Sequence, residues 1–398
     1  MPGESRQPRG IPASGRIAAA AIAVGCLSVA RRVRLPRLWV GLLLFCTPGL
    51  VSAQLAGAEA PADSARVTLQ GADIFLPPST YLSTQARRAL AALMSASPGP
   101  GFDQEIDVIR AFNTRQEQAR LAEARRLYSV RITSRTIGGV RVDEVVPDAG
   151  IAPENARRAL ILLHGGGFMW GAGAGARSEA VPIAAMARIR VIAVDYRMAP
   201  EHVFPAASED VAAVYRSLLE SYDAAAIGLY GCSAGGILAA QAVAWFDRHG
   251  LPRPGAIATA CATGAEVAGD SSHLAPLSMG RPIPPGGRPL ALADLPYFRD
   301  ADPADPLAFP IASAETLAGF PPTLLLAGTR DFSASSLTLM HRRLRAAGVA
   351  AELFLFDGLW HAFMMDPSLP ESREAYEIIA RFFALHLAPP RPPSPPAG

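Results

Sequence analysis

The feature of this sequence that most restricts its fold is a regular alternation of short apolar runs with longer segments of helical period. The apolar runs are five or six residues long and lie at Ala159–Leu163, Val191–Asp195, Ala226–Tyr230, Ala256–Ala260, Thr323–Gly328 and Ala351–Phe356. The segments of helical period lie at Ala207–Ser221, Gly235–Gly250, Ser333–Gly348 and Ser372–Leu387. Buried strands that alternate with helices predict an α/β fold, with a mainly parallel sheet covered by helices on both faces.

Two further elements are predicted upstream of this alternation. Residues Asp103–Leu127 alternate in charge at helical spacing, which predicts one or two surface helices. Residues Tyr128–Pro147 alternate β-branched and polar side chains around Gly138–Gly139, which predicts a β-hairpin.

The rest of the chain suggests one domain with an insertion and a tail. Residues Asp270–Phe320 interrupt the alternation with many prolines and glycines, and we expect them to form an insertion over one edge of the sheet. Residues 388–398 form a Pro-rich tail without apolar side chains for a core. We therefore predict a single α/β domain over residues 54–398.

The first 53 residues have the pattern of a targeting segment. Two apolar runs, Ile17–Ala30 and Leu38–Val51, flank the basic stretch Arg31–Arg37. Each run has 14 residues, whereas a membrane-spanning helix needs about 20. Small residues precede Gln54, as signal cleavage requires. The pattern predicts a secretory signal and an exported protein, periplasmic or secreted, with no stable membrane span; without cleavage the segment would be a membrane anchor.

Composition excludes several classes of function. The sequence contains no lysine, so all 37 cationic side chains are arginines, and neither a Schiff base nor a phosphate loop of the G-x-x-x-x-G-K-[ST] type can form. Without residues 1–53, 30 arginines face 34 acidic side chains, which gives no basic footprint for nucleic acid. No C-x-x-C pair occurs, so no metal site is predicted, and we expect Cys232 and Cys261 to be free.

Ser233 is the candidate nucleophile. It lies at the centre of a G-x-S-x-G motif, directly after the apolar run Ala226–Tyr230 and before the helical segment that starts at Gly235. A sharp turn between a strand and a helix projects such a serine above the sheet. The motif alone is weak, because a glycine-rich turn that happens to contain a serine would give the same pattern.

A second glycine-rich motif follows the apolar run Ala159–Leu163. His164 is followed by three consecutive glycines, which leave bare backbone N–H groups. A tetrahedral oxyanion needs donors of this kind, held in place in advance. We expect His164 itself to anchor the loop and not to act as a base.

A serine nucleophile needs a base and a carboxylate that orients the base. His361 follows the last apolar run, at the carboxyl edge where α/β sheets collect their sites. Asp331 lies just past the run Thr323–Gly328 at the same edge, and we prefer it to Asp357, which is nearer to His361 in sequence. The order Ser233, Asp331, His361 is the order found in α/β-hydrolases.

A dinucleotide-binding site is the competing interpretation. Residues Gly171–Ala176 fit G-x-G-x-x-A, and Asp195 follows 24 residues after Gly171. However, these glycines begin eight residues after Leu163, and not in the first tight turn after the strand. We therefore predict no cofactor.

Five motifs in order give the chain a family resemblance over residues 140–387. They are HGGGFMWG, DYRMAPEHVFPAASED, GCSAGG, PPTLLLAGTRD and GLWHAF. Together they resemble the hormone-sensitive-lipase-like esterases of the α/β-hydrolase superfamily. The resemblance implies an eight-stranded sheet with a helical cap, formed by about 84–127 and 270–320. It also implies hydrolysis of short- to medium-chain carboxylic esters, small molecules, without a cofactor.

The resemblance also implies roles for individual residues. Ser233 would be the nucleophile, His361 the base and Asp331 the orienting acid, and the backbone N–H groups of Gly166, Gly167 and Ala234 would form the oxyanion hole. Asp195 and Arg197 would be structural, and Glu201 and His202 would brace their loop.

Two departures and two alternatives accompany this interpretation. The residues after Asp331 lack the D-x-L pattern that is usual in the family. The family usually has an acidic residue directly before the nucleophile, where this chain has Cys232. Lactone hydrolases share the motif set, so a lactone hydrolase with the same triad is one alternative. A catalytically silent binding protein that keeps the hydrolase scaffold is the other. For an esterase, we expect acyl chains of about two to eight carbons to be preferred.

Overall fold

The computed structural model describes residues 77–97, 99–279 and 291–388. These residues form one eight-stranded sheet with the strand order β1-β2-β4-β3-β5-β6-β7-β8. The strands are β1 (Val130–Ile137), β2 (Val140–Pro147), β3 (Ala159–Leu163), β4 (Arg190–Val194), β5 (Ile227–Cys232), β6 (Ala256–Ala260), β7 (Thr323–Arg330) and β8 (Ala351–Trp360). The predicted signal over residues 1–53 and all but the first residue of the predicted tail lie outside the described residues.

The sheet is parallel from β4 to β8, and β1 and β2 add an antiparallel edge. The predicted hairpin is confirmed, because β1 and β2 pair across a turn at Gly138 and Gly139. Both glycines have positive φ, as a tight hairpin turn requires. The expected fold, a mainly parallel eight-stranded sheet with helices, is therefore confirmed.

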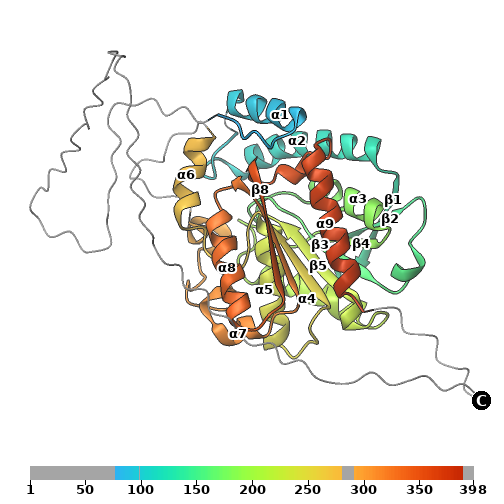
Figure 1. The fold of residues 1–398 in the computed structure, drawn as a ribbon. Helices are drawn as coiled ribbons and strands as arrows, with labels where there is room; N and C mark the ends of the chain where they lie inside the picture. The colour runs from blue at the N-terminus through green and yellow to red at the C-terminus, as the bar shows by residue number, and fades with distance from the viewer. Residues whose placement is uncertain (1–76, 98, 280–290, 389–398) are drawn as a thin grey trace, which may run out of the picture. The chain divides into compact units, whose positions relative to one another are not determined.

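Helices cover both faces of this sheet (Figure 1). The helices are α1 (Thr84–Ser95), α2 (Ile106–Leu127), α3 (Ala174–Ala187), α4 (Ala206–Leu218), α5 (Ala234–Arg248), α6 (Asp270–Ser278), α7 (Ala314–Ala318), α8 (Ala334–Ala346) and α9 (Pro370–His386). One hydrophobic core joins the sheet to α4, α5 and α8, and a second core joins the other face to α3 and α9. Along β3, Ile161 and Leu163 face the first core, and Leu160 and Leu162 face the second.

Three predicted strands end later than the sequence indicated, and β5 is one of them, since it continues to Cys232. β7 continues to Arg330 and β8 to Trp360, and these two residues pair beyond an irregularity in register at Gly328. At Gly328 the strands approach so closely that an added Cβ would lie 2.0 Å from the carbonyl oxygen of Leu359. The extension therefore depends on a long-range contact that a local pattern of apolar residues does not contain.

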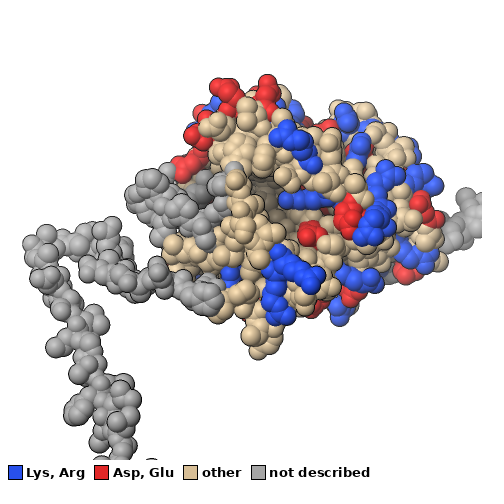
Figure 2. Space-filling view, turned by 90° about the horizontal axis from the view of Figure 1, so that it is seen from above, with Lys and Arg blue, Asp and Glu red and all other residues tan. Residues whose placement is uncertain are grey.

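The segment predicted as one or two surface helices is a single helix, α2, that packs against α3. It buries Ile109, Glu117 and Ala124, and with α1 it lies across one end of the sheet (Figure 1). Figure 2 views the molecule from this end and shows a hollow, with acidic and basic side chains on one side of it. A cap built from 84–127 and 270–320 stays a prediction; residues 280–290 of it lie outside the described residues.

No helix in the described part of the chain is both long and apolar enough to cross a membrane.

Candidate active site

Ser233 occupies a strained turn between β5 and α5. Its φ is 57° and its ψ is −124°, a conformation that a residue with a side chain rarely adopts. The two flanking glycines make the turn possible: a Cβ at Gly231 would lie 2.4 Å from the carbonyl carbon of Gly235, and one at Gly235 would lie 1.8 Å from the carbonyl oxygen of Leu163. Glycine is therefore required at both positions, because any larger residue would prevent the close contact of β3, β5 and α5.

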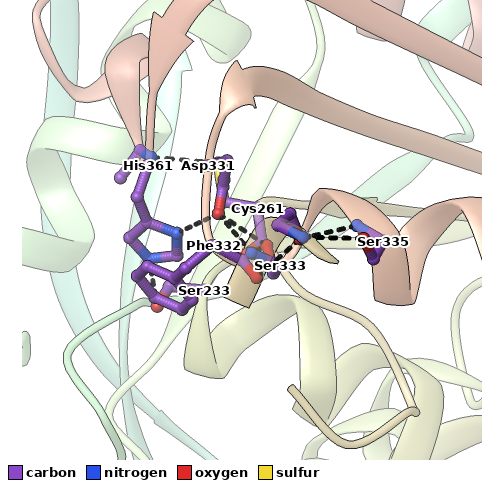
Figure 3. A network of polar contacts seen from close by, with 9 residues as sticks. Ser233, Cys261, Asp331, Phe332, Ser333, Ser335 and His361 are labelled. Carbon is purple, nitrogen blue, oxygen red and sulfur yellow. Dashed lines mark hydrogen bonds and ion pairs between the residues drawn. The ribbon is translucent and has the colours of Figure 1, made fainter. Parts of the chain in front are cut away.

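His361 joins the serine to a buried carboxylate (Figure 3). Its Nε2 lies 2.9 Å from Ser233 Oγ, and its Nδ1 lies 2.9 Å from Asp331 Oδ1. Because a carboxylate only accepts hydrogen bonds, Nδ1 carries the proton and Nε2 can accept one from the serine. The ring of Phe332 stacks on the imidazole with 4.1 Å between centroids, which limits its rotation.

Asp331 is fully buried and follows the end of β7. Its Oδ1 also accepts a hydrogen bond from the Ser333 N–H at 2.9 Å and lies 2.7 Å from the Ser333 hydroxyl. Among the described residues, Oδ2 has no partner. Asp357, the alternative acid, lies within β8 and contacts Thr329 Oγ1 at 3.3 Å and the Ser79 hydroxyl. The structure thus brings Asp331, and not Asp357, to His361.

The glycines after His164 form a tight turn beside Ser233. Gly166 has φ 109° and Gly167 has φ 59°, and the carbonyl oxygen of Gly166 accepts hydrogen bonds from Met169 and Trp170. A Cβ at Gly166 would lie 2.1 Å from the Trp170 carbonyl oxygen. The N–H groups of Gly166 and Gly167 donate to no other described residue, and Ala234 begins α5, where N–H groups have no helical acceptor.

His164 anchors this loop through its ring and its backbone carbonyl group. Its Nδ1 donates to the carbonyl oxygen of Gly165 at 2.8 Å, and its ring stacks on Tyr196 with 4.2 Å between centroids. The Tyr196 hydroxyl in turn donates to the His164 carbonyl oxygen at 2.7 Å. Complete burial lowers the pKa of His164 to about 4, so the imidazole stays neutral.

Comparisons with known proteins agree with this geometry. A sequence model described as alpha/beta hydrolase fold matches residues 160–365, just over half of the chain. The chain belongs to the α/β-hydrolase fold family. A Mycobacterium tuberculosis protein named as an acetyl-hydrolase, LipR, is 32% identical over 67% of this chain and 84% of its own length. An acetyl-hydrolase of Streptomyces hygroscopicus is 31% identical over 56% of this chain and 75% of its own length.

Comparison with solved structures narrows the group of α/β-hydrolases that this hydrolase resembles. The crystal structure of esterase E25 has a TM-score of 0.67 and 30% identity and covers 81% of this chain and 99% of its own. An esterase from the bacterial hormone-sensitive lipase family has a TM-score of 0.64 and 27% identity and covers 77% and 99%. The resemblance to hormone-sensitive-lipase-like esterases is thereby confirmed, and the chain is a carboxylic ester hydrolase.

The DYR motif of this hydrolase braces the loop before α4. Arg197 Nε lies 2.9 Å from Asp210 Oδ1, and Asp195 pairs with Arg141 at 3.5 Å. Glu201 forms an ion pair at 2.6 Å with Arg110 of α2, which ties the loop to that helix.

The glycine run that resembles a dinucleotide motif has a packing role. Gly175 lies where α3 meets α2, and a Cβ there would be 2.9 Å from the side-chain carboxyl carbon of Glu117. Gly171 and Gly175 also line the cavity at Ser233, so the close approach of α2 and α3 accounts for Gly175 without a dinucleotide. Within the described residues, no group of three or more His, Cys, Asp or Glu side chains could hold a metal ion.

Glu179 is a residue at this site that sequence reasoning missed. It projects from α3, and its Oε1 accepts a hydrogen bond from the Gly165 N–H at 2.9 Å. Burial raises the pKa of Glu179 to about 8, although the backbone N–H groups of Gly165 and Cys232 favour the charged form. Its only signal in the sequence is that it is the single acidic residue of α3 and directly precedes the apolar run Ala180–Ala187.

The two cysteines of the described chain, Cys232 and Cys261, are buried and free, as expected. Cys232 directly precedes the nucleophile, and a hydrogen bond with Cys261 together with burial raises the pKa of Cys232 well above its usual value. Both thiols therefore stay protonated at neutral pH.

Ser233 opens into a cavity of about 310 Å³. One part of the wall is apolar and consists of Ile237, Val267, Leu292, Leu295 and Phe332. Another part is polar and contains Asn113, Glu117 and Arg120 of α2 together with Glu179. Phe102 and Trp170 stack on each other at 5.9 Å between ring centroids and also line the cavity.

Proposed function

We propose that this hydrolase cleaves short- to medium-chain carboxylic esters through an acyl-enzyme formed on Ser233. The observation that carries the proposal is the chain of contacts from Ser233 Oγ to His361 Nε2 and from His361 Nδ1 to Asp331 Oδ1, each 2.9 Å. It meets the geometric requirement for an activated serine, which is a base within hydrogen-bond reach and a third group that orients the base.

In the proposed reaction, His361 removes the proton from Ser233 Oγ as the oxygen attacks the ester carbonyl carbon. The carbonyl oxygen becomes an oxyanion, which the N–H groups of Gly166, Gly167 and Ala234 stabilise. The imidazolium, stabilised by Asp331, then gives its proton to the leaving alcohol as the ester C–O bond breaks. A water molecule, deprotonated by the same histidine, attacks the acyl-enzyme and releases the acid and the free serine.

The size of the cavity supports the preference for short chains. A volume of about 310 Å³ is at the low end of the range for small-molecule pockets, which is roughly 300–1,000 Å³. The apolar wall beside Ser233 suits a hydrocarbon limb of about two to eight carbons.

The nucleophile is tested with Ser233→Ala. Turnover of p-nitrophenyl butyrate should fall by a factor of about 10⁴ or more, and a fluorophosphonate probe should label the wild type once and the variant not at all. The control is Ser221→Ala, which changes an exposed serine in the turn after α4 and should keep full activity. Near-native turnover by Ser233→Ala would remove the serine from the mechanism, and an unlabelled, inactive wild type would favour a silent binding protein.

Chain length is tested with a series of p-nitrophenyl esters from two to sixteen carbons beside a small panel of lactones. The highest kcat/KM is expected between two and eight carbons. A maximum at sixteen carbons would contradict the size argument, and a lactone rate far above that of every open ester would favour a lactone hydrolase instead.

Export stays a prediction from residues 1–53 alone, and we propose it on the pattern described above. Mass spectrometry of the protein from the periplasm or medium should find a mature N-terminus at Gln54. Recovery of the intact chain from the membrane fraction would favour an uncleaved anchor.

A further inference from the structure

One carboxyl group in the wall of the active-site cavity has no hydrogen-bond or ion-pair partner in the described part of the chain. Glu117 of α2 is only 6% exposed and lines the same cavity as Ser233. It makes no hydrogen bond and no ion pair with any described residue. Buried carboxyl groups are normally hydrogen-bonded, because an unpaired one carries a desolvation cost. A group on a bound substrate would supply the missing partner.

The fold holds this carboxyl group close to the reaction centre. Glu117 packs against Gly175 of α3, where the absent side chain makes room for it. Glu179 lies one helical turn further along α3 and accepts a hydrogen bond from Gly165, next to the proposed oxyanion donors. Since one helical turn spans about 5 Å, Glu117 lies within reach of one limb of an ester bound at Ser233.

A second polar group of α2 lines the cavity beside it. Asn113 donates from Nδ2 to the Ile109 carbonyl oxygen at 2.9 Å, which leaves its amide oxygen to accept a hydrogen bond. The apolar part of the wall, whose residues Ile237, Val267, Leu292, Leu295 and Phe332 come from elements other than α2, offers no such groups. The cavity is thus divided into a polar part under α2 and an apolar part.

The charges around Glu117 favour a neutral ligand group over a cation. Burial raises the pKa of Glu117 to about 7 and that of Glu179, the other carboxyl group in this part of the wall, to about 8, so Glu179 is mostly uncharged at neutral pH. The charge of Arg120, which lines the same cavity, lowers the pKa of both groups. Near neutral pH, Glu117 is therefore present both as the carboxylic acid, which can donate a hydrogen bond, and as the carboxylate, which can only accept one. A hydroxyl group can pair with either form, whereas an ammonium group needs the ionised form and is repelled by Arg120.

Resting on the proposed ester hydrolysis, we propose that Glu117 and Asn113 form a hydroxyl-binding subsite. The substrates of this enzyme are then esters with a hydroxyl group on one limb and a short apolar chain on the other.

The test compares pairs of esters in which a hydroxyl group replaces a methyl group of similar size. One pair varies the alcohol limb, 2-hydroxyethyl butyrate against propyl butyrate, and the other varies the acyl limb, ethyl 3-hydroxybutyrate against ethyl 3-methylbutyrate. A site built to bind a hydroxyl group rejects the analogue without it, because its own polar groups are left unpaired. In at least one pair, kcat/KM of the wild type should favour the hydroxyl ester by about tenfold or more.

Substitution of Glu117 should reverse this preference. Glu117→Leu should lower kcat/KM for the hydroxyl ester and raise it for the methyl ester, an opposite pair of changes that damage to the fold cannot produce. Glu117→Gln keeps hydrogen-bonding groups and should keep the preference. The control is Glu123→Leu. Glu123 lies on the same helix but pairs with Arg126 and does not line the cavity, so this variant should behave as the wild type.

Three outcomes would overturn the inference. They are equal rates of the wild type within both pairs, an equal loss on all esters in Glu117→Leu, or faster hydrolysis of butyrylcholine than of both its uncharged isostere 3,3-dimethylbutyl butyrate and the hydroxyl esters. Hydrolysis of p-nitrophenyl butyrate by the wild type separates these results from a failure of the proposed function, which would abolish that reaction as well.

Discussion

The substitution Asp331→Asn tests how the buried carboxylate assists His361. Oδ1 accepts hydrogen bonds from His361 Nδ1 and from the Ser333 N–H, both at 2.9 Å, and Oδ2 has no partner among the described residues. An asparagine should therefore keep its amide oxygen at the Oδ1 position, because the reverse orientation would direct an NH2 group at two N–H donors. The hydrogen bond to His361 is then preserved, and only the negative charge is lost.

The cost of losing this charge can be calculated from the geometry. His361 becomes a cation when it takes the serine proton, and with 2.9 Å between Nδ1 and Oδ1 the two charge centres lie about 4 Å apart. Unit charges at about 4 Å attract each other by about 4 kcal/mol at an effective dielectric constant of 20. Since about 1.4 kcal/mol corresponds to a factor of ten in rate, kcat should fall by about 10³.

The assay is the steady-state hydrolysis of p-nitrophenyl butyrate, with thermal unfolding as a check on folding. The amide nitrogen at the Oδ2 position would be buried without an acceptor, so Asp331→Asn should also lose about 1–3 kcal/mol of stability. Asp357→Asn is the matched control; Asp357 lies in β8 and contacts Thr329 and Ser79, so its activity should stay within about twofold of wild type. Less than a tenfold loss in Asp331→Asn, or an equal loss in both variants, would refute the reasoning.

Three further predictions concern the surroundings of the triad. Gly166→Ala should lower kcat by about 100-fold or more, because the new Cβ would lie 2.1 Å from a backbone oxygen; Gly173→Ala, also at positive φ but with no atom within 4 Å, should lose much less activity, and equal losses would contradict the role of the clash. The pKa of Glu179 is raised to about 8 by burial, so the folded state keeps a proton that the unfolded chain releases near pH 4.3, and stability should fall as pH rises through this range. Thermal melts from pH 5 to 9 should show this decline for the wild type and a smaller one for Glu179→Gln; parallel curves would contradict it. Cys232→Asp should lower the melting temperature at pH 8, because it places a second carboxyl group beside Glu179. Adding Glu179→Met to the same chain should recover most of this loss. Additive losses in the double variant would show instead that the two positions are independent.

Much of the site geometry could be predicted because parallel strands bring their carboxyl ends to one edge of the sheet. Asp331 and His361 directly follow Arg330 and Trp360, which are paired residues of the adjacent strands β7 and β8. Ser233 follows β5 in the same sheet. Once the apolar runs are recognised as strands, the polar residues that follow them must converge, even though 128 positions separate Ser233 from His361.

The polar wall of the cavity could not be predicted in the same way. Glu117 belongs to α2, whose alternating charges are typical of a surface helix, and its burial depends on contact with Gly175, which is 58 residues away. No periodic pattern in either segment contains that contact. The late ends of β7 and β8 also could not be predicted, because they depend on the close approach of Gly328 to Leu359 on the neighbouring strand.

The carboxyl group near the nucleophile comes from Glu179 and not from the residue directly before Ser233. At the position before Ser233 the sequence has a thiol where the family usually has an acid, which by itself suggests that the charge is lost. In the structure, Glu179 of α3 brings a carboxyl group to the backbone of Cys232 and accepts a hydrogen bond from the Gly165 N–H. Because burial raises the pKa of Glu179 to about 8, this group is mostly uncharged at neutral pH. The hydrogen-bond acceptor is therefore retained while the negative charge near the developing oxyanion is reduced, and a charge at this point would oppose the oxyanion.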